Sequence, residues 1–300
     1  MTDEPVSEPQ PPLFILGAPR SGTSLLYRAL ALHPDAAWIS NYGRVATALP
    51  EIAVLNRIAA RLPDRRRQVW FGKDGDNAYR YGGGRSLLDR AFPQPVEGEP
   101  VFERRHVLQG LDRTSCSARQ LRLRSDLERL TRAAGGRVLV SKRIGHNRRI
   151  GLLSEIFPDA RFLVMARDGR AVARSLLSVD WWPDSHIWWF GGTPRLWVDC
   201  GGDELELAAR HWVREVEAIE SGLSLIPVHR VLRVNYEQLV ASPYDVLESA
   251  RRFAGLTPDP AWELELRQVQ FPNRNPTTGE ADQRVTAIQS STLRALGYAA

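Results

Sequence analysis

The stretch that most constrains this 300-residue chain is 13–30, where an apolar run, a glycine-bearing turn and a helical repeat follow one another. Residues 13–16 are apolar throughout, as a strand buried on both faces of a sheet should be. The turn covers 17–22, and apolar residues then recur at helical spacing over 25–32. Backbone amides converge in such a loop at the positive end of the helix dipole. The stretch therefore predicts an anion-binding strand, loop and helix.

The loop differs from the nucleoside-triphosphate pattern G-x-x-x-x-G-K-[ST] at its most important position. Gly17 and Gly22 have the right separation, but Thr23 stands where that pattern has lysine, and the cation is Arg20, inside the loop. Without the lysine, the contact that spans the β- and γ-phosphates of ATP is lost, whereas Arg20 can address a group bonded to a single 5′-phosphate. Taken alone, the stretch is also compatible with an ordinary glycine turn.

A second anion-binding signal lies in 148–178. A predicted buried strand, 161–165, is followed by Arg167, and Ser175 comes eight residues later on the helix that should follow. An arginine at a strand end can bind a phosphate through two N–H groups, and a serine hydroxyl from the next helix can complete the site. An amphipathic helix with an incidental arginine and serine is the alternative, and the presence of both motifs in order argues against it.

The two motifs together resemble those of sulfotransferases that use 3′-phosphoadenosine-5′-phosphosulfate (PAPS). Residues 19–24, Pro-Arg-Ser-Gly-Thr-Ser, resemble the family's 5′-phosphosulfate loop P-[KR]-S-G-T-[ST], and Arg167 with Ser175 resemble its 3′-phosphate motif. The arginine form of the loop is closest to tyrosylprotein sulfotransferases and their bacterial relatives. The resemblance implies that PAPS is bound by Arg20, Ser21, Gly22, Thr23, Ser24, Arg167, Ser175 and, from a loop near the end of the chain, Arg274.

Lys142 is the third candidate in the site. It follows directly on the predicted strand 137–140, at the edge where open α/β sheets hold their ligands. It matches the lysine of the N-K-D-P segment of tyrosylprotein sulfotransferases, which implies contact with the bridging oxygen and the transferred sulfuryl group. Only two of the chain's 40 basic residues are lysines, which hints that a compact point charge is wanted here. A surface lysine is the alternative.

The residue that takes the acceptor's proton is not evident. His146, four residues after Lys142, has a suitable side chain, and the catalytic candidates are therefore Arg20, Lys142 and His146. In cytosolic sulfotransferases the histidine follows the lysine by two residues, and a plain polar loop histidine is the alternative. The tyrosylprotein family has a glutamate shortly after an H-P-D turn, where this chain has Ser40 and Asn41. The nearest carboxylate downstream is Glu51.

Four predicted strands alternate with predicted helices, and the resemblance implies one three-layer α/β/α domain with a parallel sheet of four to five strands and a P-loop-like strand, loop and helix. We expect a disordered, acidic and proline-rich leader at 1–11 and the sulfotransferase domain at 12–300. Insertions near 63–110 and 180–200 fit either an acceptor-side lid or a passive surface excursion. Five tryptophans in 180–200 fit either an acceptor surface or core packing.

Composition sets the remaining expectations. The net charge of +5 suits anionic ligands, but no basic stripe with interleaved aromatics or zinc spacing indicates a nucleic-acid partner. The sequence has no membrane-spanning apolar run and no signal peptide, so we expect a soluble, cytoplasmic and, by resemblance, bacterial protein. Cys116 and Cys200 should be free thiols. No metal is expected, because Arg20 and Lys142 supply fixed cations.

The sequence thus predicts in-line transfer of a sulfuryl group from PAPS to a hydroxyl or amine. The acceptor could be a small molecule, a carbohydrate or a peptide, and its identity and the oligomeric state stay open. A P-loop kinase or other NTPase is one alternative, which Thr23 argues against. A non-catalytic protein that binds PAPS or adenosine 3′,5′-bisphosphate is the other, because no base is evident.

Overall fold

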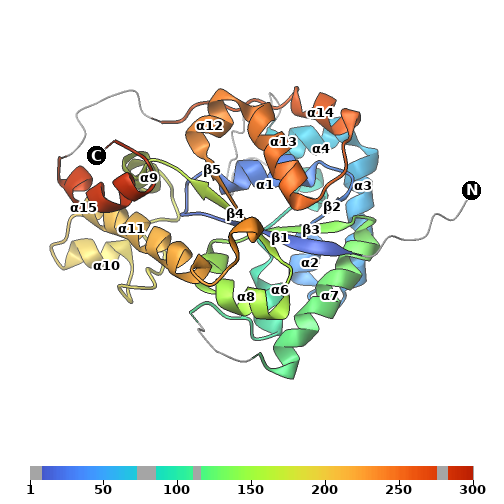
Figure 1. Cartoon of the computed structure of the whole chain (residues 1–300), viewed down its shortest axis with the longest axis horizontal. Coiled ribbons are helices and arrows are strands. Elements are labelled where there is room, and N and C mark those ends of the chain that lie inside the picture. Colours follow the sequence, from blue (N-terminus) through green and yellow to red (C-terminus); the bar gives the residue numbers. More distant parts are fainter. Residues whose placement is uncertain (1–8, 73–85, 111–115, 276–282, 300) are drawn as a thin grey trace, which may run out of the picture.

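Five parallel strands form the centre of the molecule, in the order β2-β3-β1-β4-β5 (Figure 1). The structure is a computed structural model that describes residues 9–72, 86–110, 116–275 and 283–299. This sheet confirms the expected α/β fold class with four to five parallel strands. The strands are β1 (Gln10–Leu16), β2 (Ala36–Ala37), β3 (Val138–Lys142), β4 (Arg161–Ala166) and β5 (Val231–Asn235).

The central strand β1 begins earlier than its apolar run. It starts at Gln10, two residues before the expected start of the domain, and the Gln10 amide donates to the Arg137 carbonyl at 2.8 Å. The remainder of the expected leader, 1–8, lies outside the described residues. The short strand β2 has no sequence signal of its own, because two alanines carry neither a β-branched run nor an alternation.

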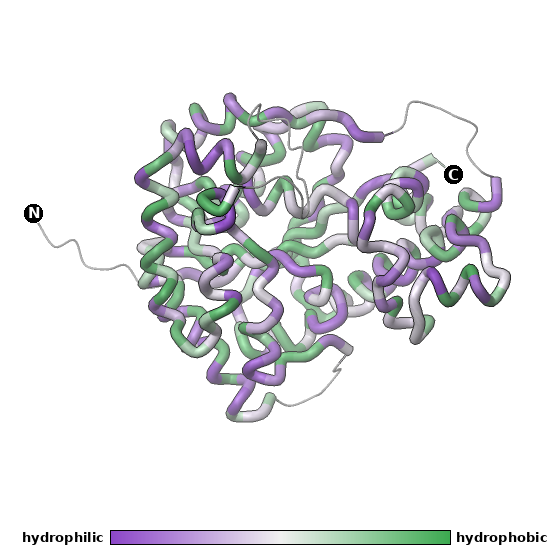
Figure 2. Tube along the Cα trace, turned by 180° about the vertical axis from the view of Figure 1, so that it is seen from behind, coloured by the Kyte–Doolittle hydropathy of each residue, from purple (hydrophilic) through white to green (hydrophobic). Residues whose placement is uncertain are grey.

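Helices cover both faces of the sheet and its carboxyl edge. Alternate residues of β1 face opposite sides, so Leu13 and Ile15 pack with α1 and α13, whereas Phe14 and Leu16 pack with α7 and α8. In Figure 2 the central strands are drawn mainly in the hydrophobic colour. The α-helices are α1 (Thr23–Ala31), α2 (Asn41–Val45), α3 (Asn56–Arg61), α4 (Pro63–Phe71), α5 (Leu87–Ala91), α6 (Glu99–Arg104), α7 (Ala118–Ala134), α8 (Ile150–Ile156), α9 (Gly169–Leu177), α10 (Pro194–Asp199), α11 (Glu204–Leu223), α12 (Tyr236–Ala241), α13 (Pro243–Ala254), α14 (Pro260–Leu266) and α15 (Gln283–Ala295).

A third apolar cluster lies at the carboxyl edge of the sheet, between α9, α11 and α15. The tryptophans of the 180–200 segment largely belong to it. Trp182 is buried, and Trp189 and Trp197 pack against the cluster, while Trp181 and Trp188 stay partly exposed. Core packing therefore accounts for most of this tryptophan-rich segment.

The apolar spacing of the sequence predicts one helix over 44–61 and another over about 117–134 with Leu121 on its inward face, and both predictions are wrong in detail. The helix expected over 44–61 is divided into α2, the 3₁₀ helix η1 (Pro50–Leu55) and α3, because Pro50 cannot donate a helical hydrogen bond. Leu121 of α7, expected to face the core, is 48% exposed. The buried stripe of α7 is formed by Leu123, Leu127 and Leu130, and Leu121 lies on the opposite side of the helix.

Its charge predicts that the arginine run 65–67 is a solvated turn, and the structure shows otherwise. The run lies within α4, and Arg66 points inward to form an ion pair with Glu265 of α14. The Arg66 Nε lies 3.1 Å from Glu265 Oε1, and both side chains are 11% exposed. The rest of the 63–110 insertion includes α5 and α6, while 73–85 lies outside the described residues. No helix in the described ranges has the length and apolar character needed to cross a membrane.

The buried pair gives a stability prediction. Glu265→Gln should lower the free energy of unfolding by about 3 kcal/mol, because it leaves the Arg66 guanidinium buried without its counter-charge. Urea denaturation measures the change. The double variant Arg66→Met/Glu265→Leu is the control, and it should recover most of the loss by replacing the pair with apolar contacts. A single variant as stable as the unmodified protein would contradict the prediction.

Candidate functional site

The carboxyl ends of three adjacent strands meet at one edge of the sheet. Ile15 of β1 pairs in register with Lys142 of β3, and Leu16 pairs with Val164 of β4. The glycine loop after β1, Lys142 and Arg167 after β4 therefore start from neighbouring points, as the order of strands requires.

The loop that follows β1 depends on two glycines. A Cβ on Gly17 would lie 2.7 Å from the Met165 carbonyl oxygen, and one on Gly22 would lie 2.6 Å from the Tyr236 ring. Gly22 also has φ +89° at the N-cap of α1. These contacts let the loop approach β4 and α12 more closely than any larger residue would allow.

Hydrogen bonds join the two sequence motifs into one site. The Arg20 Nε donates to the Ser175 Oγ at 3.0 Å, and the Arg167 Nη1 donates to the Arg20 carbonyl at 2.6 Å. Arg20 has φ +69°, an uncommon conformation for a residue with a side chain. The loop 19–24 and the motif formed by Arg167 and Ser175 thus lie against each other.

The Arg167 guanidinium is held on three sides. Its plane lies over the Tyr236 ring, with Cζ 4.3 Å from the ring centroid. Nε donates to the Asn275 Oδ1 at 2.8 Å, and Nη2 donates to the Arg274 carbonyl at 2.9 Å. Arg274 therefore contacts Arg167 through its main chain. The Arg274 amide also donates to the Tyr236 hydroxyl at 3.1 Å. Pro276 and Thr277 of the same loop lie outside the described residues.

The loop also presents polar groups suited to a bound phosphate. The Ser21 Oγ is buried and has no hydrogen-bond partner among the residues that the structure describes. Thr23 and Ser24 begin α1, where the first amides of a helix have no partner within it. An orphaned hydroxyl beside converging amides fits a phosphate oxygen, so the residues present suit the nucleotide implied by the sequence.

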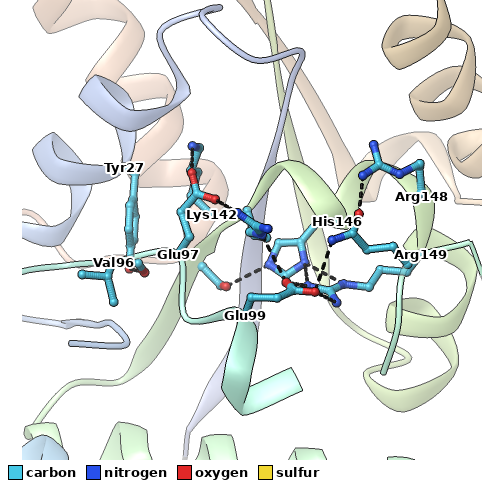
Figure 3. Close-up of polar contacts among 11 residues, drawn as sticks. Tyr27, Val96, Glu97, Glu99, Lys142, His146, Arg148 and Arg149 are labelled. Atoms are coloured by element: carbon cyan, nitrogen blue, oxygen red, sulfur yellow. Dashed lines mark hydrogen bonds and ion pairs between the residues drawn. The ribbon is translucent and has the colours of Figure 1, made fainter. Parts of the chain in front are cut away.

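Lys142 is buried at the end of β3 and is paired. Its Nζ lies 2.5 Å from the Glu97 Oε1, and the other carboxylate oxygen of Glu97 lies 2.5 Å from the Arg143 Nη1 (Figure 3). Figure 3 shows Glu97 and Glu99 reaching from the 63–110 insertion toward the basic residues that follow β3. This insertion therefore borders the site, although the sequence did not single out Glu97.

His146 lies deeper than a proton acceptor for a bound substrate should. The ring is fully buried between Phe14 and Phe102, with centroid distances of 5.2 and 4.8 Å. Its Nε2 lies 3.0 Å from the Ser141 Oγ, and its Nδ1 accepts from the Arg149 Nε at 3.1 Å. Burial, reinforced by Arg149 and the neighbouring cations, holds the pKa of His146 well below its ordinary value. Both nitrogens are engaged within the protein, so this geometry favours a structural role.

Asn147, the next residue, fixes the start of the glycine loop. Its side chain accepts from the Gly17 amide at 3.2 Å and donates to the Gly17 carbonyl at 3.0 Å. It also donates to the Glu215 carboxylate at 2.6 Å, which in turn binds Arg148 and the Trp188 indole at 2.5 and 2.8 Å. An asparagine in the short 3₁₀ helix η2 (Ile144–Arg148) gives no sequence signal for such a role, which depends on α11 packing beneath the glycine loop.

The other carboxylate and polar candidates have structural partners. Glu51 is on the surface in an ion pair with Arg129 of α7. The Ser40 Oγ caps α2 by accepting from Gly43, and Asn41 binds the Arg90 and Gln94 main chain. Across the described ranges, His, Cys, Asp and Glu side chains form no group of three that could hold a metal ion. Cys116 and Cys200 are free thiols.

Comparison with known proteins agrees with this geometry. A sequence model described as the Sulfotransferase family matches residues 11–260. The chain belongs to the sulfotransferase family. It is 25% identical over 260 residues to protein-tyrosine sulfotransferase 2 of Gallus gallus and 24% identical over 268 residues to the protein-tyrosine sulfotransferase of Drosophila melanogaster. These matches cover 84% and 88% of this chain but 53% and 41% of those proteins, so the chain spans about half the length of the curated relatives it matches.

Solved sulfotransferases have the same fold. The sulfotransferase STF9 of Mycobacterium avium superimposes with a TM-score of 0.58 at 17% identity, over 99% of this chain and 79% of that one. The sulfotransferase STF1 of Mycobacterium tuberculosis gives 0.58 at 17% identity, over 94% and 76% of the two chains. The family and fold expected from the sequence are thereby confirmed, while the roles of individual site residues stay predictions.

The buried histidines give a pH prediction. Burial lowers the pKa of His33, His146 and His211. Below about pH 6.5 the unfolded chain takes up protons that the folded protein does not, so stability should fall as the pH falls. Each such histidine contributes a slope of up to about 1.4 kcal/mol per pH unit.

This prediction is tested by how the free energy of unfolding changes with pH, and not by its absolute value. His146→Gln should make the free energy of unfolding less dependent on pH between about 6.5 and 5, measured by urea denaturation at several pH values. His229→Gln, at an exposed position, is the matched control and should keep the original slope. Equal slopes in the His146 variant and the unmodified protein would contradict the assignment.

Proposed function

We propose that this protein transfers a sulfuryl group from PAPS to a hydroxyl or amine of an acceptor. The observation that supports it most is the direct contact of the two motifs, with Arg20 bound to Ser175 and Arg167 bound to the Arg20 carbonyl. PAPS carries a phosphosulfate and a 3′-phosphate on the same adenosine. To bind both groups, the two motifs must lie no farther apart than these groups do in one nucleotide. An NTP site would require neither Arg167 nor Ser175.

In this proposal each group has an electrostatic task. The amides and hydroxyls of 21–24 bind the 5′-phosphate, and Arg167 with Ser175 binds the 3′-phosphate. Arg20 and Lys142 stabilise negative charge on the transferred sulfuryl group and on the leaving oxygen. The protein would supply position and fixed charge, as enzymes of phosphoryl transfer do, with adenosine 3′,5′-bisphosphate as the product.

The part of the site that binds the acceptor is proposed to lie beside the carboxyl end of β3. Glu97, the Arg143 guanidinium and the exposed part of Trp188 border that side of the molecule. The name of the protein-tyrosine relatives makes a tyrosine-bearing peptide one candidate acceptor. Carbohydrates and small metabolites remain equal candidates, because neither Ser40 nor Asn41 supplies a carboxylate where the sequence pattern of those relatives has a glutamate.

The nucleotide assignment is tested by Arg167→Ala. Removing the guanidinium should weaken binding of adenosine 3′,5′-bisphosphate by about 10- to 100-fold, because charge-assisted hydrogen bonds to the 3′-phosphate are lost. Adenosine 5′-monophosphate, which lacks that phosphate, should lose far less affinity. Calorimetry measures both ligands, and Arg195→Ala on the exposed Arg195–Asp184 pair is the control. An unchanged preference for the bisphosphate would contradict the assignment.

The catalytic assignment is tested by Lys142→Ala. Turnover of PAPS should fall about 100-fold or more, while affinity for adenosine 3′,5′-bisphosphate changes little. Magnesium-dependent hydrolysis of ATP by the unmodified protein would instead support an NTPase. Tight nucleotide binding without transfer to any acceptor would support a non-catalytic binding protein.

A further inference from the structure

Main-chain pairing carries one carboxylate of the 63–110 insertion to the reacting edge of the sheet. Residues 94–96 run antiparallel to 39–41: the Asn41 amide donates to the Gln94 carbonyl at 3.2 Å, and the Val96 amide donates to the Ile39 carbonyl at 2.9 Å. The next residue is Glu97. The Tyr27 hydroxyl of α1 donates to the Val96 carbonyl and holds the segment from the other side (Figure 3).

Glu97 lies across the outer side of Lys142. The lysine side chain is 6% exposed, whereas the Glu97 side chain is 35% exposed. Glu97 is therefore the partner of this ion pair that is more accessible to solvent. By contrast, Glu99 on α6 forms a bidentate ion pair with the fully buried Arg149. The Arg149 Nη1 and Nη2 lie 3.0 and 2.8 Å from the two carboxylate oxygens.

We propose that Glu97 is the residue that takes the proton from the acceptor, and that Lys142 leaves Glu97 for the sulfate donor when the nucleotide binds. This inference rests on the proposed sulfuryl transfer. The acceptor oxygen attacks sulfur, the new O–S bond forms, and the bond from sulfur to the bridging oxygen breaks. Lys142 stabilises the charge on the bridging oxygen, and the hydroxyl proton moves to a Glu97 oxygen.

The charges around Glu97 are consistent with this exchange. Burial raises the pKa of its carboxyl, but Lys142 and Arg143 outweigh burial and hold the pKa at about 2. Among the described residues, Tyr27 from α1 also interacts with Glu97, and Glu99 from α6 shares Arg143 with it. When Lys142 moves to the donor, one of the two cations leaves and the carboxylate becomes more basic. With both cations in place the carboxyl is ionised at neutral pH, as a base must be before it accepts a proton.

Other candidates are engaged elsewhere. Both ring nitrogens of His146 are bound within the core, and Glu51 lies on the surface with Arg129. Among the residues that the structure describes, Glu97 is the carboxylate that forms an ion pair with Lys142.

Acceptors of different acidity test the chemical role. Glu97→Gln should slow transfer to phenol, an aliphatic alcohol and water by about 100-fold or more, because these acceptors must lose a proton. Transfer to a nitrophenol, which is already ionised near neutral pH, should change little. Glu99→Gln is the matched control: it should lower thermal stability but affect all acceptors alike. Equal slowing of nitrophenol and phenol by Glu97→Gln would overturn the proposal.

Nucleotide binding tests the exchange of Lys142 without any acceptor. Glu97→Gln should bind adenosine 3′,5′-bisphosphate about tenfold more tightly, because Lys142 no longer has to leave an ion pair. The double variant Glu97→Gln/Lys142→Ala should lose that gain. Calorimetry measures all three proteins.

These outcomes separate the inference from the proposed function. If the unmodified protein does not bind the bisphosphate, the proposed function itself fails. If it binds but Glu97→Gln shows unchanged affinity, Lys142 is not exchanged and the role given to Glu97 is overturned, while the nucleotide assignment stands. Tighter binding together with acceptor-dependent slowing supports the inference.

Discussion

The hydrogen bond from Arg167 to the Arg20 carbonyl is the interaction on which the site depends. Arg20 has a left-handed conformation, which costs a residue with a side chain roughly 1–2 kcal/mol. The contact at 2.6 Å with Arg167, and the bond from Arg20 Nε to Ser175, offset that cost and fix the direction of the Arg20 side chain. Each motif thus supplies contacts that hold the other in its observed geometry. The loop and the strand-end arginine are therefore one structural unit, although 147 residues separate them.

The end of the chain completes this unit. Glu237 on α12 accepts from the Asp168 amide, the Asn275 side chain and the Tyr298 hydroxyl, at 3.2, 2.9 and 2.8 Å. It thus joins the start of α9, the segment before 276 and the residues after α15. Because Asn275 and the Arg274 carbonyl occupy two edges of the Arg167 guanidinium, a phosphate must approach along the donors that remain or displace this segment. The final elements of the chain are part of the site's geometry.

The sequence predicted the sheet and its ligand-bearing edge because these depend on local patterns. Short apolar runs identify buried strands, and Lys142 and Arg167 lie where those strands end. Residues that act through tertiary contacts gave no such signal: Asn147 binds Gly17 only because α11 packs below the loop, and Glu97 reaches Lys142 through strand-like pairing with 39–41. Arg66 gives no signal for the same reason, since a charge run cannot reveal which arginine faces a buried carboxylate.

The counter-charges around the site form a graded series that follows their distance from solvent. Four cations occur between 142 and 149, and their mutual repulsion requires carboxylates when no anionic ligand is bound. Glu215 and Glu99, with side chains 1% and 13% exposed, bind Arg148 and the buried Arg149. A buried pair of this kind is costly to separate, so these partners are permanent. Glu97, with a side chain 35% exposed, binds Lys142. The pair that we propose opens during catalysis is thus the one whose carboxylate side chain is most exposed.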